Sequence, residues 1–344
     1  MNPAAQKAHA VVMTQYGPPS VLSYVEVPLP PVGPHELRIR TLAAAVNHTD
    51  LEIRAGNWPV RKPDAFPYTP GVEVVGEVQE VGNAVQDIRR GDRVITMMQG
   101  LGGVRGERRG GYAEYVTVGA ETVAVIPTEI DPVRMAALGL VGVTAYEGLR
   151  RIGQLADQCI LVTGAAGGVG SAAVAIAHAQ GASVVGLVAR ASQAEYVLGL
   201  GANEVIVAPR GDPPQLAPES VNGVLDCVGG DLFRPCVAAL RPGGVLSLVG
   251  AVGGGEVTFD AWQLIQPVTL TGYSTETLDG STLRQAVAAL STWLGTEVIQ
   301  PPDFQSVPLA EARHAHERLE QGGVHGRILL VPAQSSIGQL RAVL

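Results

Sequence analysis

The sequence predicts an α/β protein in which helices wind a parallel sheet on both faces and a β-rich domain is attached. From about residue 140, apolar strand-length runs alternate with helix-length segments, which is typical of βαβ units. A glycine-rich turn at residues 164–170 joins the first such strand to its helix. Before residue 140, short alternating runs are punctuated by Gly, Pro, Asp and Asn, which is typical of a barrel or sandwich.

The expected elements follow from these patterns. In the β-rich part, strands are expected at 10–13, 36–42, 72–81, 93–96 and 112–118. In the βαβ part, strands are expected at 159–163, 183–189, 204–207, 223–228 and 244–249, and helices at 171–180, 193–200 and 281–294. At the C-terminal end, extended segments at 304–307 and 327–331 flank a helix at 310–321, and residues 332–344 have no clear partner element.

Composition excludes several classes of protein. Hydrophobic residues make up 46% of the 344 residues and charged residues 16%, which excludes a disordered chain. A net charge of −8 disfavours binding to a nucleic-acid backbone, and we interpret the small basic cluster of Arg105, Arg108 and Arg109 as a solvated loop. The three cysteines lack C-x-x-C spacing, and neither a signal segment nor a long apolar span is visible. We therefore expect a soluble cytoplasmic protein with neither a nucleic-acid nor a membrane partner.

The glycine-rich turn is the strongest functional signal. Glycine lets the backbone turn sharply and approach a pyrophosphate, and the helix that follows presents free N–H groups. Ala165 replaces the usual first glycine of G-x-G-x-x-G. The residues expected to contact a nucleotide here are Gly164, Ala166, Gly167, Gly168, Val169 and Gly170. The alternative, a purely structural turn, is disfavoured by the strand before it and the helix after it.

The end of the next strand bears on the choice between NADH and NADPH. An acidic residue about 20 positions past the glycines would bind the ribose hydroxyls of NADH, but residues 188–193 contain none. Arg190 suits a 2′-phosphate, because a guanidinium forms bidentate charge-assisted bonds, and Ser192 is expected to assist it. The alternative is a solvent-facing arginine at a helix start. We expect NADPH as the cofactor.

A series of motifs gives the chain a family resemblance. The matching stretches are 47–50 (NHTD), 71–76 (GVEVVG), 91–94 (GDRV), 110–116 (GGYAEYV), 143–146 (VTAY), the glycine-rich turn, 226–229 (DCVG) and 241–244 (RPGG). Over residues 8–332 the chain resembles the medium-chain dehydrogenase/reductase superfamily, and within it the zinc-free quinone oxidoreductase (NADPH:quinone reductase-like) branch. The resemblance implies a Rossmann domain with a doubly wound parallel sheet at 139–297. It also implies a discontinuous GroES-like β-rich catalytic domain, formed by 1–138 and 298–344.

The resemblance also bears on metal. Zinc alcohol dehydrogenases of the superfamily carry Cys and His where this sequence has Asn47 and Val72. Valine offers no lone pair and an amide is a poor zinc ligand. The structural-zinc lobe of those enzymes uses four cysteines, and residues 97–111 contain none. His314 and His316, the one close histidine pair, fall on an expected surface helix where ligation is not expected. We therefore expect no metal.

Without zinc, alcohol oxidation loses its Lewis acid. A quinone or conjugated enone is already electrophilic, so hydride transfer to it needs only hydrogen-bond donors and a proton source. The sequence thus favours an NADPH-dependent reductase of quinones or α,β-unsaturated carbonyls. The alternatives are an enoyl-thioester reductase of a biosynthetic pathway and a non-catalytic NADPH-binding sensor or structural protein.

The resemblance implies roles for individual residues. Asn47 lies where the zinc-free branch keeps an amide beside the nicotinamide and substrate, and the candidate catalytic residues are Asn47, Thr49 and Trp58. Trp58 stands near a tyrosine position of several relatives and can stack on a flat substrate, but it is a poor proton donor. The further cofactor residues implied are His48, Thr144, Val228, Gly250, Val252 and Arg327. The alternatives are that Asn47 and Thr144 act as caps and that His48 is an ordinary histidine.

The roles of two acidic residues, the proton donor and the oligomeric state are less closely determined by the sequence. Asp50 and Glu73 are retained although their zinc-site neighbours are replaced, and we interpret them as structural residues or as residues that support those in contact with the ligands. The proton donor stays open between Tyr68, Tyr112, Tyr146 and water. Residues 268–273 alternate like an exposed edge strand, and together with the resemblance this predicts a homodimer formed by strand pairing.

Overall fold

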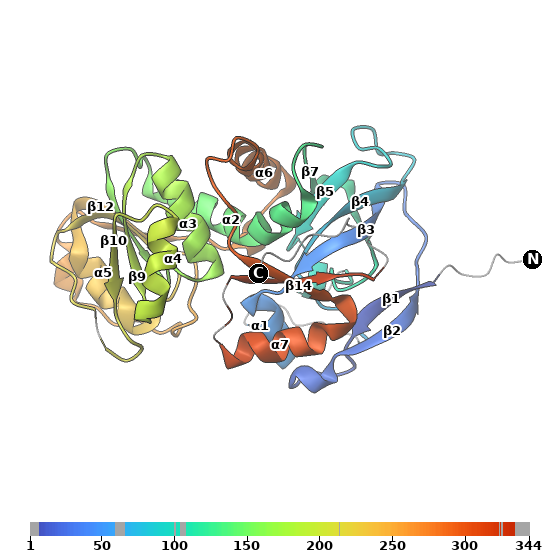
Figure 1. Ribbon diagram of the computed structural model, residues 1–344, viewed down its shortest axis with the longest axis horizontal. Coiled ribbons are helices and arrows are strands. Elements are labelled where there is room, and N and C mark those ends of the chain that lie inside the picture. Colours follow the sequence, from blue (N-terminus) through green and yellow to red (C-terminus); the bar gives the residue numbers. More distant parts are fainter. Residues whose placement is uncertain are drawn as a thin grey trace, which may run out of the picture. The chain divides into compact units, whose positions relative to one another are not determined.

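The computed structural model divides into two compact units (Figure 1). It describes residues 7–58, 66–99, 101–103, 108–212, 214–322, 324 and 326–333, so Arg105 and residues 334–344 lie outside the described residues. Unit 1 comprises Met1–Leu140, Glu276–Ser291 and Asp303–Leu344, and unit 2 comprises Val141–Thr275 and Thr292–Pro302. The domain limits expected from the sequence stay a prediction.

Unit 1 is built on a seven-stranded sheet. The strand order is β14-β15-β3-β4-β5-β7, with β6 also paired to β3. The strands are β3 (Glu36–Ala45), β4 (Glu73–Val81), β5 (Arg93–Met97), β6 (Tyr115–Gly119), β7 (Val123–Val125), β14 (Phe304–Pro308) and β15 (Arg327–Val331). Strand β15 pairs with β3 through Leu329 and Ala45, so both ends of the chain share one sheet. A separate hairpin joins β1 (Lys7–Val12) to β2 (Ser23–Pro28).

Unit 2 contains the doubly wound parallel sheet that the sequence predicts. Its order is β10-β9-β8-β11-β12-β13, and every pairing is parallel. The strands are β8 (Cys159–Thr163), β9 (Ser183–Val188), β10 (Glu204–Val207), β11 (Val221–Asp226), β12 (Leu240–Leu248) and β13 (Thr269–Gly272). The chain leaves β8 toward one edge and returns to build the other half, so the strand order reverses between β8 and β11.

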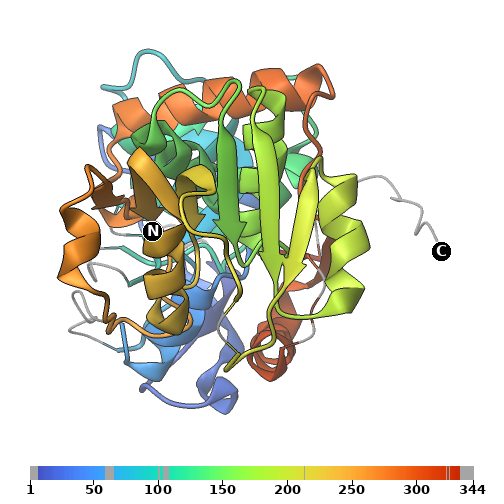
Figure 2. The same ribbon diagram turned by 90° about the vertical axis from the view of Figure 1, so that its left-hand side faces the viewer.

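Helices cover both faces of this sheet (Figures 1 and 2). Helices α3 (Gly168–Ala179) and α4 (Ala194–Gly199) lie on one face, and α5 (Phe233–Ala239) lies on the other. Phe233 and Cys236 of α5 pack with Leu161, Val224 and Leu246 of the sheet in one buried cluster. Burying these apolar side chains contributes about 1.5–3 kcal/mol for each large one.

Several elements differ from those expected. The sequence pattern missed α1 (His48–Ala55), α2 (Pro132–Ile152) and α5, as well as β2 and β7. Most residues of α2 are buried, so it lacks the polar face that gives a helix its sequence period. Helix α3 begins at Gly168 rather than at residue 171, because its first turn includes two glycines of the glycine-rich turn, Gly168 and Gly170. Helices α6 (Gly280–Gly295) and α7 (Ala312–Gln321) lie close to their expected positions.

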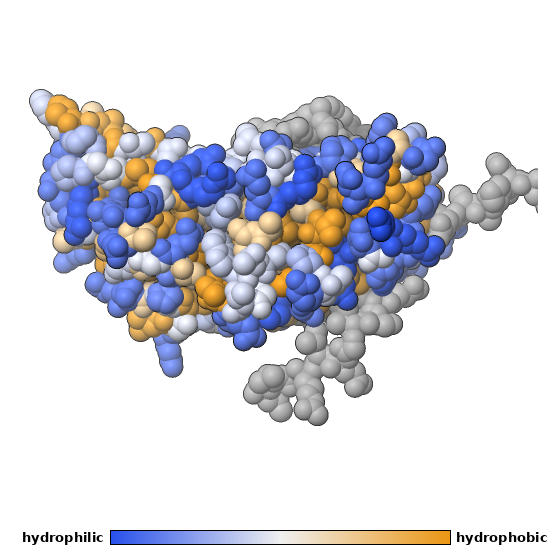
Figure 3. Space-filling model, turned by 90° about the horizontal axis from the view of Figure 1, so that it is seen from above, coloured by the Kyte–Doolittle hydropathy of each residue, from blue (hydrophilic) through white to orange (hydrophobic). Residues whose placement is uncertain are grey.

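Among the described residues, no helix is long and apolar enough to cross a membrane. Figure 3 shows a face on which hydrophilic and hydrophobic residues are mixed. The most exposed large apolar side chains include Trp262 (74%) and Ile265 (71%), which precede the edge strand β13. Exposed apolar residues that precede an edge strand are typical of a surface through which copies of a protein associate.

A buried polar chain ties α1 to α7 inside unit 1. Arg54 contacts Nδ1 of His316 at 3.3 Å, and Tyr112 Oη lies 3.1 Å from its Nε2. Arg54 also pairs with Glu320. Because arginine only donates, Nδ1 must accept, and the ring proton therefore sits on Nε2. The expected surface location is thus wrong for His316, which is fully buried, whereas the His314 side chain is 61% exposed.

The buried histidine predicts an acid-sensitive stability. Burial, reinforced by the Arg54 charge, lowers the pKa of His316 from 6.5 to about 3. Below about pH 6.5 the unfolded chain binds a proton at this histidine, whereas the folded chain does not. The contribution of His316 to the free energy of unfolding is therefore full above about pH 6.5 and is lost as the pH falls toward 3. The expected slope is about 1.4 kcal/mol per pH unit for one proton.

Urea unfolding of the wild type and of His316→Gln at about pH 7 and about pH 4 checks this prediction. The wild type should lose more unfolding free energy on acidification than the variant, by about 1 kcal/mol per pH unit. His314→Gln, on the same helix but exposed, is the matched control and should follow the wild type. Equal acid sensitivity of all three proteins would contradict it.

Candidate active site

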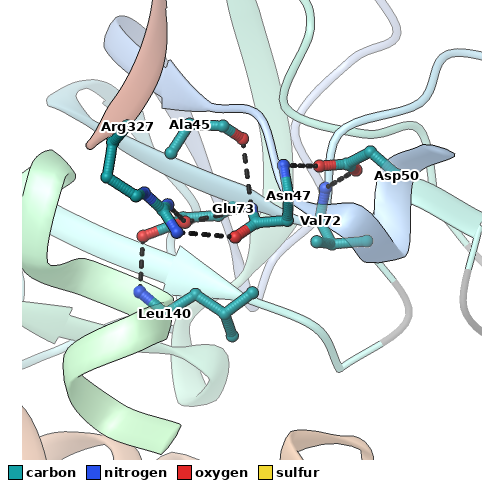
Figure 4. Close-up of polar contacts among 7 residues, drawn as sticks. All are labelled: Ala45, Asn47, Asp50, Val72, Glu73, Leu140 and Arg327. Atoms are coloured by element: carbon teal, nitrogen blue, oxygen red, sulfur yellow. Dashed lines mark hydrogen bonds and ion pairs between the residues drawn. The ribbon is translucent and has the colours of Figure 1, made fainter. Parts of the chain in front are cut away.

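The first candidate site centres on Asn47 at the start of α1 in unit 1 (Figure 4). Asn47 is the N-terminal capping residue of the helix and is 6% exposed. Its Nδ2 donates to the carbonyl of Ala45 at 3.2 Å and to Oε2 of Glu73 at 3.2 Å. Its Oδ1 accepts from Nη1 of Arg327 at 3.0 Å. Partners of fixed polarity on both sides settle the orientation of the amide.

Glu73 and Arg327 form a buried ion pair around this amide. Their side chains are 0% and 5% exposed, and Arg327 Nη2 lies 3.0 Å from Glu73 Oε2. The other carboxylate oxygen, Oε1, accepts from the backbone N–H of Leu140 at 2.6 Å. Gly139 makes room for this contact, because a Cβ there would collide with Oε1. Every oxygen of Glu73 is therefore committed to a donor of the protein itself.

Asp50 supports the same turn from below. Its Oδ2 accepts from the backbone N–H of Asn47 and its Oδ1 from that of Val72, both at 2.9 Å. Burial raises the pKa of Asp50 to about 7, although these two bonds and a hydrogen bond from Tyr112 favour the ionised form. Burial also raises the pKa of Tyr112 well above 10. Asp50 and Glu73, which the sequence analysis expects to be structural or to support the site residues, thus shape the surroundings of Asn47.

The other predicted catalytic residues lie on or just after the same helix. His48 is exposed and Thr49 half-buried in the first turn of α1. Trp58 follows the helix, and its buried Nε1 has no acceptor among the residues that the structure describes. Because both hydrogens of the Asn47 amide are used internally, Asn47 offers a ligand only a remaining lone pair of its Oδ1. Thr49, with its hydroxyl, and Trp58, with its indole N–H, are side-chain donors on and just after this helix.

The second candidate site lies in unit 2, at the glycine-rich turn. Gly164 follows β8 with φ +59°, and Gly167 is the N-terminal capping residue of α3. A Cβ at Gly170 would collide with the carbonyl of Gly164, so the turn closes this tightly only with glycine. Gly168, Val169 and Gly170 form the first helical turn, whose N–H groups have no partner within the helix. Such a turn can hold an anion, as the sequence predicts for phosphate.

The remaining predicted cofactor residues of unit 2 are spread over its strand ends and one helix. Val228 follows β11, and its Cγ2 would lie 3.0 Å from a Cβ on Gly164, so these two predicted residues are brought together. Gly250 and Val252 follow β12, and Val252 is 65% exposed. Thr144 lies in α2 and is 8% exposed. All the loops named here lie at the carboxyl ends of parallel strands, where ligands bind in such sheets.

Two arginines stand at the ends of neighbouring strands. Arg190 and Ser192 follow β9 and are exposed. The backbone N–H of Arg190 donates to the Gln193 side chain at 3.1 Å, and its carbonyl accepts from the Gln193 backbone N–H at 3.0 Å. Arg210 follows β10, which pairs with β9 up to Val207 and Val188. Sequence patterns alone do not point to Arg210, because only the pairing of β10 with β9 shows that it follows a strand beside that of Arg190. Among the residues that the structure describes, neither guanidinium has a hydrogen-bond acceptor.

The two family models that match this chain describe its two halves. The "Alcohol dehydrogenase GroES-like domain" matches residues 33–128, and the "Zinc-binding dehydrogenase" matches residues 168–292. The first match agrees with the β-rich catalytic domain expected from the sequence, and the second covers most of the parallel sheet.

Relatives match along nearly the whole chain. A quinone oxidoreductase of Lama guanicoe is 32% identical, with 94% of this chain and 97% of the relative covered. An alcohol dehydrogenase of Geobacillus stearothermophilus is 30% identical, with 90% and 95% covered. The structure of Escherichia coli quinone oxidoreductase complexed with NADPH has a TM-score of 0.81 at 28% identity and covers 94% of this chain and 100% of its own. The chain is therefore an oxidoreductase that belongs to the quinone oxidoreductase branch of the medium-chain dehydrogenase/reductase superfamily.

Proposed function

We propose that this chain is an NADPH-dependent reductase of quinones or α,β-unsaturated carbonyls that works without zinc. The observation that carries the proposal is the Asn47–Glu73–Arg327 network. It fills with internal hydrogen bonds the place where the zinc enzymes of the superfamily, by the resemblance above, keep metal ligands. A quinone oxidoreductase with NADPH among the structural neighbours supports the same assignment.

The donor set of this network does not fit zinc. Glu73 accepts hydrogen bonds at both oxygens, and the side chain of Val72 has no atom with a lone pair that could bind zinc. Arg327 places a permanent positive charge 3.0 Å from both Asn47 and Glu73, and this charge would repel a cation. The described residues contain no group of three or more His, Cys, Asp or Glu side chains arranged for a metal. The assignment to a zinc-independent reductase rests on this chemistry of the donors.

The residues of unit 2 fit a dinucleotide phosphate. The tight glycine turn and the start of α3 would hold the pyrophosphate, and Arg190, with Ser192 and Arg210, would face a 2′-phosphate. When bound, NADPH supplies the hydride. Val228 and Gly250, at neighbouring strand ends, would limit the space beside the cofactor. Arg327, which the resemblance implies as a cofactor residue, has its guanidinium engaged with Asn47 and Glu73 and would act by orienting Asn47.

The protein's part in the reaction is to bind the acceptor and to stabilise charge on its oxygen. As the β-carbon of an enone gains a hydride, the electron pair of the C=C bond moves toward the carbonyl oxygen. Thr49 and Trp58 are the donors available for that oxygen, and a proton then adds to the α-carbon to give the saturated carbonyl. A quinone gains the same hydride and proton and becomes a hydroquinone.

A substrate panel tests the proposed function. Purified protein is mixed with NADPH and a series of quinones, enones and enoyl thioesters, and nicotinamide absorbance is followed. We expect saturable oxidation of NADPH with a quinone or a simple enone. Turnover confined to an alcohol with NADP+, or to an enoyl thioester, would contradict the substrate class, and cofactor binding without any turnover would support a non-catalytic role instead.

The cofactor preference should depend on Arg190. A hydrogen bond to a charged group contributes about 1.5–3 kcal/mol. Arg190→Ala should therefore raise the KM for NADPH about 10- to 150-fold and leave that for NADH little changed. Arg210→Ala should act in the same direction and more weakly, because it stands one strand farther out. Steady-state kinetics with both cofactors measure this.

The control for that experiment is Arg234→Ala. Arg234 is an exposed arginine of the same unit, on α5 and not at a strand end. It should leave both KM values unchanged. Equal losses for NADPH and NADH in Arg190→Ala would mean that Arg190 supports the adenine pocket or the fold instead.

We also propose a homodimer formed through the edge of the parallel sheet. Within the described chain, β13 pairs only with β12, so its outer edge presents unpaired backbone groups, and the exposed Trp262 and Ile265 precede it. Light scattering should give a dimer at micromolar concentration, and Ile265→Lys should shift it toward monomer. Val298→Lys, at another exposed apolar residue of unit 2, should leave the dimer intact. A monomeric wild type would contradict the proposal.

A further inference from the structure

Asp226 is a buried carboxylate that the proposed reaction does not use. It is the last residue of β11, the strand next to β8 at the reversal of strand order, and it is 0% exposed. No arginine, lysine or histidine pairs with it among the described residues, and its Oδ2 has no hydrogen-bond partner there. A carboxylate is costly to bury without a counter-ion, so its presence calls for an explanation.

The other carboxylate oxygen of Asp226 accepts three hydrogen bonds. Its Oδ1 accepts from the Thr163 hydroxyl at 2.6 Å, from the backbone N–H of Val228 at 3.0 Å and from that of Gly229 at 3.1 Å. The Thr163 Oγ1 in turn accepts from the backbone N–H of Cys227 at 2.9 Å. These four hydrogen bonds fix three consecutive residues after β11 to the end of β8. The 2.6 Å bond has the length of a strong charge-assisted hydrogen bond.

The segments joined in this way are the ones that the sequence assigns to the cofactor. Thr163 directly precedes Gly164 of the glycine-rich turn, and Val228 packs on Gly164. On the other side, a Cβ at Gly250 would lie only 2.6 Å from the carbonyl oxygen of Cys227. The turn at Cys227–Gly229 is thus held between the loops that follow β8 and β12. Gly229 adopts φ +68° there, which favours glycine.

We infer that Asp226 and Thr163 are positioning residues of the dinucleotide site. They lock the Cys227–Gly229 turn against the glycine-rich turn, so that both are already formed before the cofactor binds. A pre-formed site binds more tightly, because less conformational entropy is lost on binding. The inference rests on the proposed function, since it assigns a role within the proposed NADPH site.

The test removes the Thr163 hydroxyl while keeping the shape of the side chain. In Thr163→Val, the dissociation constant and the KM for NADPH should rise about 10-fold, which corresponds to about 1.4 kcal/mol, while kcat at saturating NADPH stays within about 2-fold. Thr163→Ser keeps the hydroxyl and should restore NADPH binding to within about 2-fold of the wild type. Ser247→Ala is the matched control, because Ser247 is a buried hydroxyl on the neighbouring strand β12 without a hydrogen-bond partner among the described residues.

A second ligand separates a positioning role from general damage. Adenosine 2′-monophosphate carries the adenosine and the 2′-phosphate of the cofactor but no 5′-phosphate. The Arg190 end of β9 would bind it, and its dissociation constant should be unchanged in Thr163→Val. Asp226→Asn, which keeps an acceptor oxygen without the charge, should also weaken NADPH selectively if Thr163→Val does not fold. Unchanged NADPH binding in a folded Thr163→Val, or equal weakening of both ligands, would overturn the inference. A wild type that binds neither ligand would instead refute the proposed NADPH site.

Discussion

The ion pair between Arg327 and Glu73 is the interaction on which unit 1 depends. The two residues are 254 positions apart in the chain, and both are buried. Removing one partner of such a pair typically costs about 3–5 kcal/mol, because it leaves an unpaired charge in the interior. Their pairing joins β15 to β4 across β3 and fixes the amide of Asn47 in one orientation. The same contact therefore closes a domain made from both ends of the chain and shapes its candidate site.

The candidate site of unit 2 is formed by groups of another kind. This site must receive phosphate, so it relies on glycine backbone, a helix start and exposed arginines rather than on a buried ion pair. A buried carboxylate nearby, that of Asp226, accepts hydrogen bonds from backbone N–H groups and a hydroxyl. Buried charges in both units thus organise the backbone around a site and are largely satisfied by the protein itself.

Local patterns in the sequence predicted much of this, and long-range pairing explains the rest. The parallel sheet and the glycine-rich turn were predictable, because strand, turn and helix follow one another directly. Helix α2 was missed because burial removes its polar face, and α1 because it is short. The side-chain partners of the Asn47 amide lie 26 and 280 positions away, so no local spacing reveals them. Arg210 and Arg190 follow strands that are neighbours only through sheet pairing. Burial of His316 has the same origin, since Arg54 and Tyr112 come from distant segments.

We propose that a permanent organic cation, Arg327, and the hydrogen bonds around it take the place that, by the resemblance, holds zinc ligands in the zinc enzymes of the superfamily. The most direct measurement is zinc content and the rate of quinone reduction by NADPH on one purified sample, before and after treatment with a strong chelator. We expect well under one zinc per chain, and a rate of quinone reduction that the chelator leaves unchanged. One tightly bound equivalent of zinc, or a rate that falls with the chelator and returns with added zinc, would contradict it.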